Sequence, residues 1–237
     1  MSANFTAEAE SRNTASDMVW FDFGGVLSPP LDSIFVEYGR KTGVTPAQLQ
    51  QALRDSSAIL GGNALSALEL SEITEVEFGR LLRRALTGVD LSAARLETFG
   101  AQWFEGVQAN PLMIGAARTL RALGHRIGVL SNNVVEWEPY WRPMISEMGE
   151  PDCVIDSCRV GCRKPDPRIF GIAERTASVR PGNCVLIDDV AENCTAAVTA
   201  GWQAVHFRTD QQTLTELSQL LGHSELLAAA PSPVARL

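Results

Sequence analysis

Apolar and polar positions follow two different rhythms along this chain, and the change comes near residue 110. Between about residues 31 and 107, apolar residues recur every three or four positions. In the stretch LDSIFVEYGRKTG the side chains of Ile34, Phe35 and Tyr38 share one side, and Gly43 follows as a helix stop. Thr45 and Pro46 open the next segment as an N-cap and a first-turn proline. The spacing predicts an all-helical region over residues 31–107.

A second rhythm starts near residue 111, where short apolar runs alternate with helical segments. The runs are RIGVL, CVIDS, CVLI and QAVHF, and VWF near the start of the chain belongs with them. Short apolar strands that alternate with helices indicate a parallel sheet with helices on both faces. We therefore predict a doubly wound, Rossmann-like α/β core made of residues 18–30 and 108–223. Residues 1–17 and 224–237 are expected to be disordered tails.

Composition narrows the functions open to such a protein. The 237 residues carry a net charge of −8 with a pI near 5.0, which argues against nucleic acid and membranes as partners. No apolar run approaches the roughly 20 residues of a membrane helix, and the first 17 residues lack the apolar stretch of a signal peptide. The five cysteines form no CxxC pair, so reduced cysteines are expected rather than a zinc site. We expect a cytoplasmic protein.

Polar side chains directly follow three of the predicted strands: Asp22 after VWF, Ser131 after RIGVL, and Asp188 with Asp189 after CVLI. The carboxyl ends of parallel strands share one edge of a sheet, and ligands bind there. A carboxylate at such a place is costly to bury unless a cation or several N–H donors meet it. Lys164, in the proline-rich turn GCRKPDP, is a candidate for that cation.

These groups suit phosphoryl transfer. A carboxylate that attacks a phosphoryl group must overcome repulsion between anions, and a divalent cation together with a lysine reduces that repulsion. The Ser131 hydroxyl, the Asn132 amide and nearby backbone N–H groups are placed to hold phosphoryl oxygens. Mg²⁺ suits a shell of carboxylate, carbonyl and water oxygens. The residues therefore predict a Mg²⁺-dependent reaction on a small phosphorylated substrate.

Four motifs in this order resemble the haloacid dehalogenase (HAD) superfamily, and within it the branch that includes the phosphatase domain of soluble epoxide hydrolase. The matching stretches are FDFGGVL, VLSNN, GCRKPDPRIF and LIDDVAENCTAAVTAG, and the resemblance covers about residues 19–207. The resemblance implies a small, mobile, all-helical cap inserted after the first strand. The predicted helical region 31–107 lies at that place.

The resemblance also implies a role for each site residue. It implies a metal site made of four residues: Asp22, Gly24 through its backbone carbonyl, Asp188 and Asp189. It implies that Asp22 is the nucleophile and forms an aspartyl-phosphate. Three residues would contact or stabilise the phosphoryl group: Ser131, Asn132 and Lys164.

The chain departs from the family pattern at Gly24. Phosphatases of the family carry a second Asp at this place, which protonates the leaving oxygen and then activates water. Three interpretations stay open. A Mg²⁺-dependent phosphatase is favoured because Asp188 and Asp189 are both present. A metal-independent 2-haloacid dehalogenase also lacks the second Asp, and a catalytically impaired HAD-fold binding protein is the third.

The aromatic cluster WEPYW follows the second motif. Helical spacing favours packing for its rings, with contact to substrate under the cap as the alternative. No residue of the cap can be assigned to a substrate from the sequence. The identity of the substrate and the oligomeric state are left open.

Overall fold

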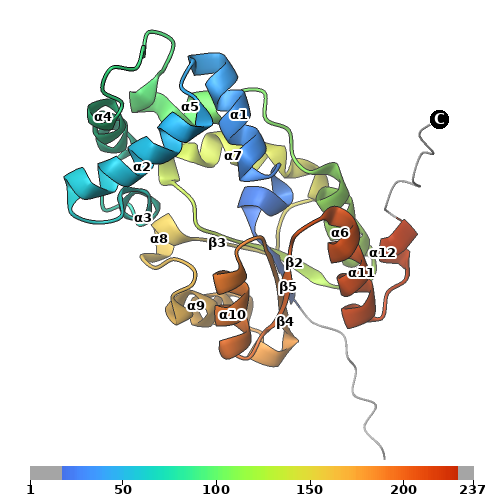
Figure 1. The fold of residues 1–237 in the computed structure, drawn as a ribbon. Helices are drawn as coiled ribbons and strands as arrows, with labels where there is room; N and C mark the ends of the chain where they lie inside the picture. Colours follow the sequence, from blue (N-terminus) through green and yellow to red (C-terminus); the bar gives the residue numbers. More distant parts are fainter. Residues whose placement is uncertain (1–17, 229–237) are drawn as a thin grey trace, which may run out of the picture.

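The computed structural model describes residues 18–228, and its centre is a five-stranded parallel sheet (Figure 1). The strands lie in the order β3-β2-β1-β4-β5. Their bounds are β1 Met18–Phe21, β2 Arg126–Ser131, β3 Cys153–Asp156, β4 Cys184–Asp188 and β5 Gln203–His206. Phe21 of β1 is paired with Val129 of β2 on one side and with Ile187 of β4 on the other. Asp22, Ser131 and Asp188 therefore emerge at one edge, as the strand ends predict.

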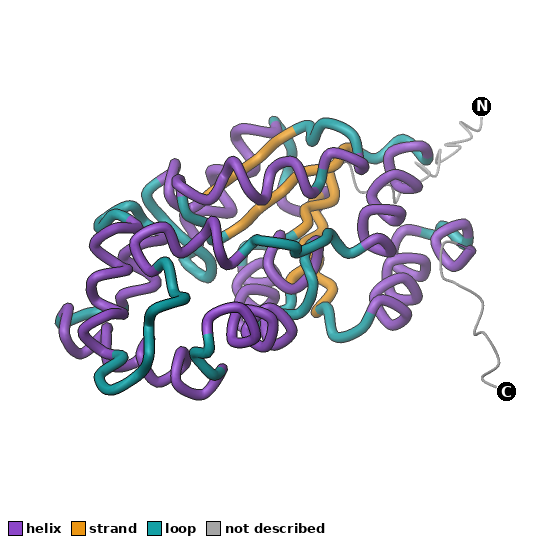
Figure 2. The backbone as a smooth tube through the Cα atoms, turned by 90° about the horizontal axis from the view of Figure 1, so that it is seen from above, coloured by secondary structure: helices purple, strands orange, loops and turns teal. Residues whose placement is uncertain are grey.

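Side chains of the central strand β1 alternate between two apolar layers. Val19 and Phe21 pack toward α6 and α11, whereas Met18 and Trp20 pack toward α9 and α10, and all four are fully buried. The bounds of these helices are α6 Pro111–Ala122, α9 Pro167–Ala177, α10 Ala191–Thr199 and α11 Asp210–Leu221. The predicted doubly wound α/β fold is confirmed. Figure 2 shows the strands gathered together with helices around them.

Shorter elements complete the core. They are η1 Phe23–Leu27, η3 Val135–Trp137, α7 Glu138–Met144, η4 Ser146–Met148, α8 Ser157–Val160, η5 Pro181–Asn183 and α12 Glu225–Ala228.

Residues 31–107, which we call the cap, contain helices and turns and no strand, and the structure describes all of them. The helices are α1 Leu31–Thr42, α2 Pro46–Leu60, α3 Ala64–Glu69, α4 Glu75–Ala85, η2 Leu96–Thr98 and α5 Phe99–Trp103. Thr45 and Thr74 begin α2 and α4 with capping boxes, which satisfy N–H groups that a helix start leaves without partners. The helical insertion after β1 is confirmed, and Figure 1 shows it on one side of the sheet.

The two chain crossings between cap and core lie side by side. The Asn110 N–H donates to the Leu27 carbonyl oxygen over 2.8 Å. The Asn110 side chain also accepts hydrogen bonds at the start of α6, so the second crossing enters the core at a fixed point. The domain boundaries near Pro30 and residue 108, and hinge motion between them, stay predictions.

The prediction of a disordered tail from residue 224 onward is wrong for its first residues. Glu225–Ala228 form α12, and Leu226 is fully buried against α6 and α11. Leu226 packs between two helices and so orders a single turn, and such a tertiary contact cannot be read from the composition of the tail. Residues 1–17 and 229–237 lie outside the described part. Within the described part, no helix is both long enough and apolar enough to cross a membrane.

Candidate active site

Asp22 is fixed at the end of β1 by its backbone and its side chain. Its N–H donates to the Ile187 carbonyl over 2.9 Å, which extends the pairing of β1 with β4 by one residue. Its Oδ1 accepts the N–H of Phe23 over 2.8 Å. The residue is 7% exposed, so the direction of its side chain is set by the strand end and the turn that follows.

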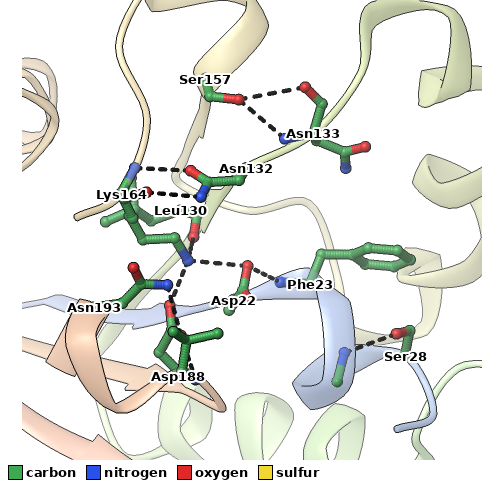
Figure 3. Close-up of polar contacts among 12 residues, drawn as sticks. Asp22, Phe23, Ser28, Leu130, Asn132, Asn133, Ser157, Lys164, Asp188 and Asn193 are labelled. Carbon is green, nitrogen blue, oxygen red and sulfur yellow. Dashed lines mark hydrogen bonds and ion pairs between the residues drawn. The ribbon is translucent and has the colours of Figure 1, made fainter. Parts of the chain in front are cut away.

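Lys164 lies between two of the strand-end carboxylates (Figure 3). Its Nζ is 3.0 Å from Asp22 Oδ1 and 2.5 Å from Asp188 Oδ2, and it donates to the Leu130 carbonyl over 2.7 Å. The side chain is 1% exposed. Burial alone would lower the pKa of Lys164, but the Asp188 and Asp22 carboxylates raise it well above its usual range. The lysine is therefore held as a cation beside Asp22.

Asp22, Asp188 and Asp189 offer oxygens that all lie within 4.8 Å of one another, the one such acidic group found among residues 18–228. Burial raises the pKa of the Asp22 carboxyl to about 7, and although Lys164 lowers it, Asp188 and Asp189 add to the rise. Burial and the neighbouring Asp188 raise the pKa of Asp189 to about 6. Crowded, desolvated carboxylates are stabilised by a cation. The donor set fits a divalent ion that prefers oxygen ligands.

Asp188 is held by donors on both oxygens. Asn193 Nδ2 and the Val190 N–H each donate to Oδ1 over 2.9 Å, while Lys164 occupies Oδ2. Asn193 was not among the predicted site residues. The signal was present, because Asn193 lies in the fourth motif, on the first turn of α10, five positions after Asp188.

Asn132 holds the turn that carries Lys164. Its Oδ1 accepts the Lys164 N–H over 2.8 Å, and its Nδ2 donates to the Lys164 carbonyl over 3.0 Å. Both ends of the amide are thus engaged by the backbone of the lysine. The predicted contact of Asn132 with a phosphoryl group stays a prediction, and the structure adds a positioning role. Ser131, 1% exposed, ends β2 beside it.

A cavity of about 330 Å³ lies between cap and core. From the core, its lining includes the predicted site residues Asp22, Gly24, Ser131, Asn132 and Asp189. Its cap side is formed by residues of α1 to α5 and of the short segment that follows α5. Five of the seven predicted residues thus line the cavity. The other two, Lys164 and Asp188, each contact a lining residue: Lys164 is bonded to Asp22, and Asp188 to Asn193.

The two glycines after Asp22 differ in what they need. Gly25 has φ 74°, and a Cβ there would come within 2.2 Å of Asp189 Oδ2, so glycine is required for this turn and for the carboxylate beside it. Gly24 has φ −66° and ψ 124°, which any residue adopts. A Cβ on Gly24 would meet only Leu31, at 4.0 Å. The absent carboxylate is therefore a chemical feature of this chain, and backbone geometry does not impose it.

Glu69 of the cap and Arg163 of the core meet at the cavity, which both line. Arg163 Nε donates to Glu69 Oε2 over 2.7 Å. Ser157 Oγ donates to the Glu69 carbonyl over 2.7 Å and so fixes the end of α3 to the core. Burial raises the pKa of Glu69, and Arg163 opposes that rise. These contacts join the cap to the residue next to Lys164.

The aromatic cluster WEPYW divides between its two predicted uses. Trp141 is fully buried, with its ring 5.3 Å from that of Phe23 between centroids, which is packing. Trp137 lines the cavity, and its Nε1 donates to Glu75 Oε1 over 2.7 Å. Packing describes Trp141, while Trp137 is placed where a ligand in the cavity would touch it.

A family model described as haloacid dehalogenase-like hydrolase matches residues 18–201. That span holds all four motifs, the cap and the carboxylate cluster. The chain belongs to this family. The predicted resemblance is confirmed, and the protein is a HAD-like hydrolase.

Three curated relatives share sequence with this HAD-like hydrolase. Acyl-CoA dehydrogenase family member 10 of Mus musculus is 30% identical over 213 residues, which are 86% of this chain and 19% of that protein. Bifunctional epoxide hydrolase 2 of Sus scrofa is 30% identical over 125 residues, 51% of this chain and 22% of that protein. The chain thus spans about a fifth of the length of these two. Sesquiterpene phosphatase astK of Aspergillus oryzae is 24% identical over 207 residues, 85% of this chain and 95% of that protein.

Two solved structures share the fold. A HAD family enzyme of Bacteroides thetaiotaomicron, in complex with magnesium and inorganic phosphate, has a TM-score of 0.61 at 18% identity, covering 81% of this chain and 94% of that one. L-2-haloacid dehalogenase of Xanthobacter autotrophicus has a TM-score of 0.60 at 17% identity, covering 91% and 84%. At these identities the likeness shows the shared fold.

Proposed function

We propose that this HAD-like hydrolase is a Mg²⁺-dependent phosphatase of a small phosphate monoester, with Asp22 as its nucleophile. The observation that carries the proposal is the group of three carboxylates within 4.8 Å of one another, with Lys164 bonded to two of them. A lone nucleophile would not need that excess of negative charge, whereas a site for a divalent cation does. Asp22, Asp188, Asp189 and the Gly24 carbonyl would hold the ion.

The reaction follows from what these residues can do. An Asp22 carboxylate oxygen attacks phosphorus, the bond from phosphorus to the alcohol oxygen breaks, and the alcohol leaves after taking a proton. Water then attacks the phosphorus of phosphoryl-Asp22 and releases phosphate. Lys164 offsets charge on Asp22 and on the phosphoryl group, and Ser131 and Asn132 supply donors to its oxygens. The bound Mg²⁺ would reduce the repulsion between nucleophile and phosphate.

Gly24 makes both proton transfers harder. Positioned acid–base groups contribute typically about 10²–10⁴ in rate. We therefore expect slow turnover, a bias toward leaving groups of low pKa, and phosphoryl-Asp22 that accumulates enough to be trapped. Similarity to a sesquiterpene phosphatase, and to a HAD family enzyme in complex with magnesium and inorganic phosphate, supports this assignment in part.

Dehalogenation of a 2-haloacid is the second candidate, because dehalogenases of the family also lack the second Asp, where this chain has Gly24. It explains the Asp188–Asp189 pair less well, since that chemistry needs no metal. The two candidates predict opposite responses to chelation. Phosphate release with Mg²⁺ should stop in EDTA, whereas chloride release from 2-chloropropionate would continue.

The test is a panel of phosphate esters assayed with Mg²⁺ and with EDTA, together with Asp22→Asn. We expect Asp22→Asn to fold and to lose turnover and phosphoryl trapping. Asp156→Asn is the matched control, because Asp156 also ends a strand at this edge but does not line the cavity. Chloride release from 2-chloropropionate in EDTA, without phosphate release from the panel, would shift the assignment to the dehalogenase. Phosphate release that persists in EDTA would remove the metal from the proposal, and equal losses in both variants would remove Asp22 from the role of nucleophile.

A further inference from the structure

The cavity between cap and core has a size that packing does not explain. Protein interiors are close-packed, with few voids larger than a water molecule. The volume here, about 330 Å³, is at the lower end of the roughly 300–1,000 Å³ typical of ligand sites. Because Asp22 and Asp189 line it, a substrate phosphate held at the carboxylates would leave the rest of the molecule in this space.

The cap contributes an almost wholly apolar lining. Eleven cap residues line the cavity; ten of them are apolar, and Glu69 is the exception. Leu53 of α2 and Leu65 of α3 are partly exposed and pack against the main apolar cluster. With the phosphate at the carboxylates, the alcohol part of the substrate would face these apolar side chains of the cap.

The cap side of the cavity offers few partners to a strongly polar alcohol. Among the described residues that line it, Arg163 is the one cation, and Glu69 already accepts its Nε–H over 2.7 Å. A second anionic group on the substrate would meet a neutralised arginine and apolar walls. Several hydroxyl groups would lose water without gaining partners on the cap side, which costs free energy.

We propose that the substrate is a phosphate monoester of an uncharged, apolar alcohol, with an alkyl or aryl group packed against the cap. This inference rests on the proposed phosphatase function, since it takes the phosphate to lie at Asp22. Apolar surface removed from water then supplies the binding, and the cavity volume limits the size of the group.

A homologous series tests the proposal. Primary alkyl phosphates from ethyl to octyl have nearly constant leaving-group pKa and differ in apolar area. With Mg²⁺ we expect kcat/KM to rise about three- to fourfold per buried methylene until the cavity is full. Glycerol phosphate and glucose 6-phosphate should be poorer than hexyl phosphate. A flat series, or a preference for the polyhydroxy esters, would overturn the proposal.

Two substitutions on α2 locate the effect. Leu53→Asn places an amide in the lining, and we expect it to lower kcat/KM for octyl phosphate about tenfold while leaving ethyl phosphate nearly unchanged. Ile59→Asn is the matched control, because Ile59 is 37% exposed and does not line the cavity. Equal effects of both variants on octyl phosphate would contradict the assignment of this wall.

Binding without turnover separates this inference from the proposed function. Trp103 and Trp137 line the cavity, so tryptophan fluorescence should report titration with ethyl- and octylphosphonate. If no ester is hydrolysed, yet phosphonate affinity rises with chain length and Leu53→Asn weakens it, the phosphatase function fails and the apolar site stands. If the esters are hydrolysed, yet neither kcat/KM nor phosphonate affinity depends on chain length, the phosphatase function stands and the apolar site is contradicted.

Discussion

The core wall and the cap wall of the cavity are built in different ways. The core wall carries polar groups at the ends of β1, β2 and β4, and several of them are fixed by hydrogen bonds, such as Asp22 to the Phe23 N–H and Asn132 to the Lys164 backbone. Apart from Glu69, the cap wall consists of apolar side chains from separate helices, which pack against one another. A wall fixed by strand ends can position charge, whereas a wall of packed side chains can change shape with little cost to the fold.

Because of this difference, we expect the core wall to set the reaction rate and the cap wall to set which substrates are accepted. Substitutions in the core wall should change the reaction of every substrate, because they alter charge at the reacting atoms. Substitutions in the cap wall should change which alcohol is accepted, since they alter only apolar area. The predictions below test whether the two walls can be separated in that way.

The largest effect is expected from Lys164→Met. It removes the cation from between Asp22 and Asp188 and leaves two buried carboxylates facing each other. Breaking a buried ion pair typically costs about 3–5 kcal/mol of stability, and loss of a charge-stabilising donor costs about 10²–10³ in kcat. Urea unfolding and turnover on the alkyl series measure both, and turnover should fall alike for every chain length.

Arg163→Met is the control, since it removes the neighbouring cation, whose side chain is 32% exposed. We expect it to cost no more than about 1 kcal/mol of stability. Equal losses of stability and turnover in the two variants would show that Lys164 and Arg163 contribute equally. The position of Lys164 between Asp22 and Asp188 would then have no special effect.

Gly24→Asp should have the next largest effect, and it is a gain. The backbone at Gly24 accepts a side chain, and the cavity offers it room. We expect hydrolysis of alkyl phosphates to rise about 10- to 100-fold, below the full range of a positioned acid–base group because the new carboxylate lacks supporting contacts. A rate series across leaving-group pKa for both enzymes checks this, with a shallower slope expected for Gly24→Asp.

Two neighbouring substitutions make that test specific. Gly24→Ala adds the Cβ without the carboxylate and should leave the rate unchanged. Gly25→Ala should impair both folding and activity, because φ 74° and the approach to Asp189 leave no place for a Cβ. If wild type already shows a flat series and Gly24→Asp brings no gain, another group supplies the proton.

The core could be predicted from the sequence because its order follows from the chain. The runs ending at Asp22, Ser131 and Asp188 alternate with helices, and parallel strands bring their ends to one edge. Asn193 lies in the fourth motif, five positions after Asp188, but its hydrogen bond to Asp188 is visible only in the structure, so the sequence alone does not single it out. The two roles within WEPYW also depend on contacts with Phe23 and Glu75, which lie far away in the sequence.

The cap could be predicted only as a set of helices. Apolar spacing finds each helix, but an apolar side chain that lines a cavity and one that fills a core have the same sequence pattern. Leu49 and Leu53, both on α2, are an example. Both line the cavity, but Leu49 is 1% exposed and belongs to the buried cluster, whereas Leu53 is partly exposed. The Glu69–Arg163 pair spans 94 positions, a distance that no motif covers.

A smaller effect, on stability alone, is expected from Asp156→Asn. Burial raises the pKa of Asp156 to about 6 from 3.8, Glu138 adds to the rise, and Oδ1 has no hydrogen-bond partner. A raised folded-state pKa means that the folded protein binds more protons than the unfolded chain between about pH 4 and pH 6, so stability falls as pH rises through that window. The variant should therefore gain about 1–2 kcal/mol at pH 7, within the roughly 3 kcal/mol that the shift allows.

Urea unfolding from pH 4 to pH 8 measures that effect, and wild type and Asp156→Asn should converge toward pH 4. Turnover should be unchanged, because Asp156 does not line the cavity. An equal pH dependence in both proteins would show that the carboxyl is solvated in solution. A loss of turnover would extend the core wall to the end of β3.

The smallest effect is expected from Glu69→Gln, where the two walls touch. Glu69 is the one cap carboxylate that lines the cavity, and it is bonded to Arg163, so we expect it to hold the cap in place rather than to transfer protons. A partly exposed pair is worth about 0.2–1 kcal/mol, which corresponds to a rise in KM of about 1.4- to fivefold with kcat nearly unchanged. Glu72→Gln, on an exposed cap residue outside the lining, is the control and should change neither constant.

The double variant Glu69→Gln with Gly24→Asp tests whether Glu69 transfers protons. If Glu69→Gln instead lowers kcat by about 10² or more and the aspartate at position 24 restores it, then Glu69 supplies the proton that Gly24 cannot. In that case the cap wall would take part in catalysis, and rate and selection would no longer belong to separate walls.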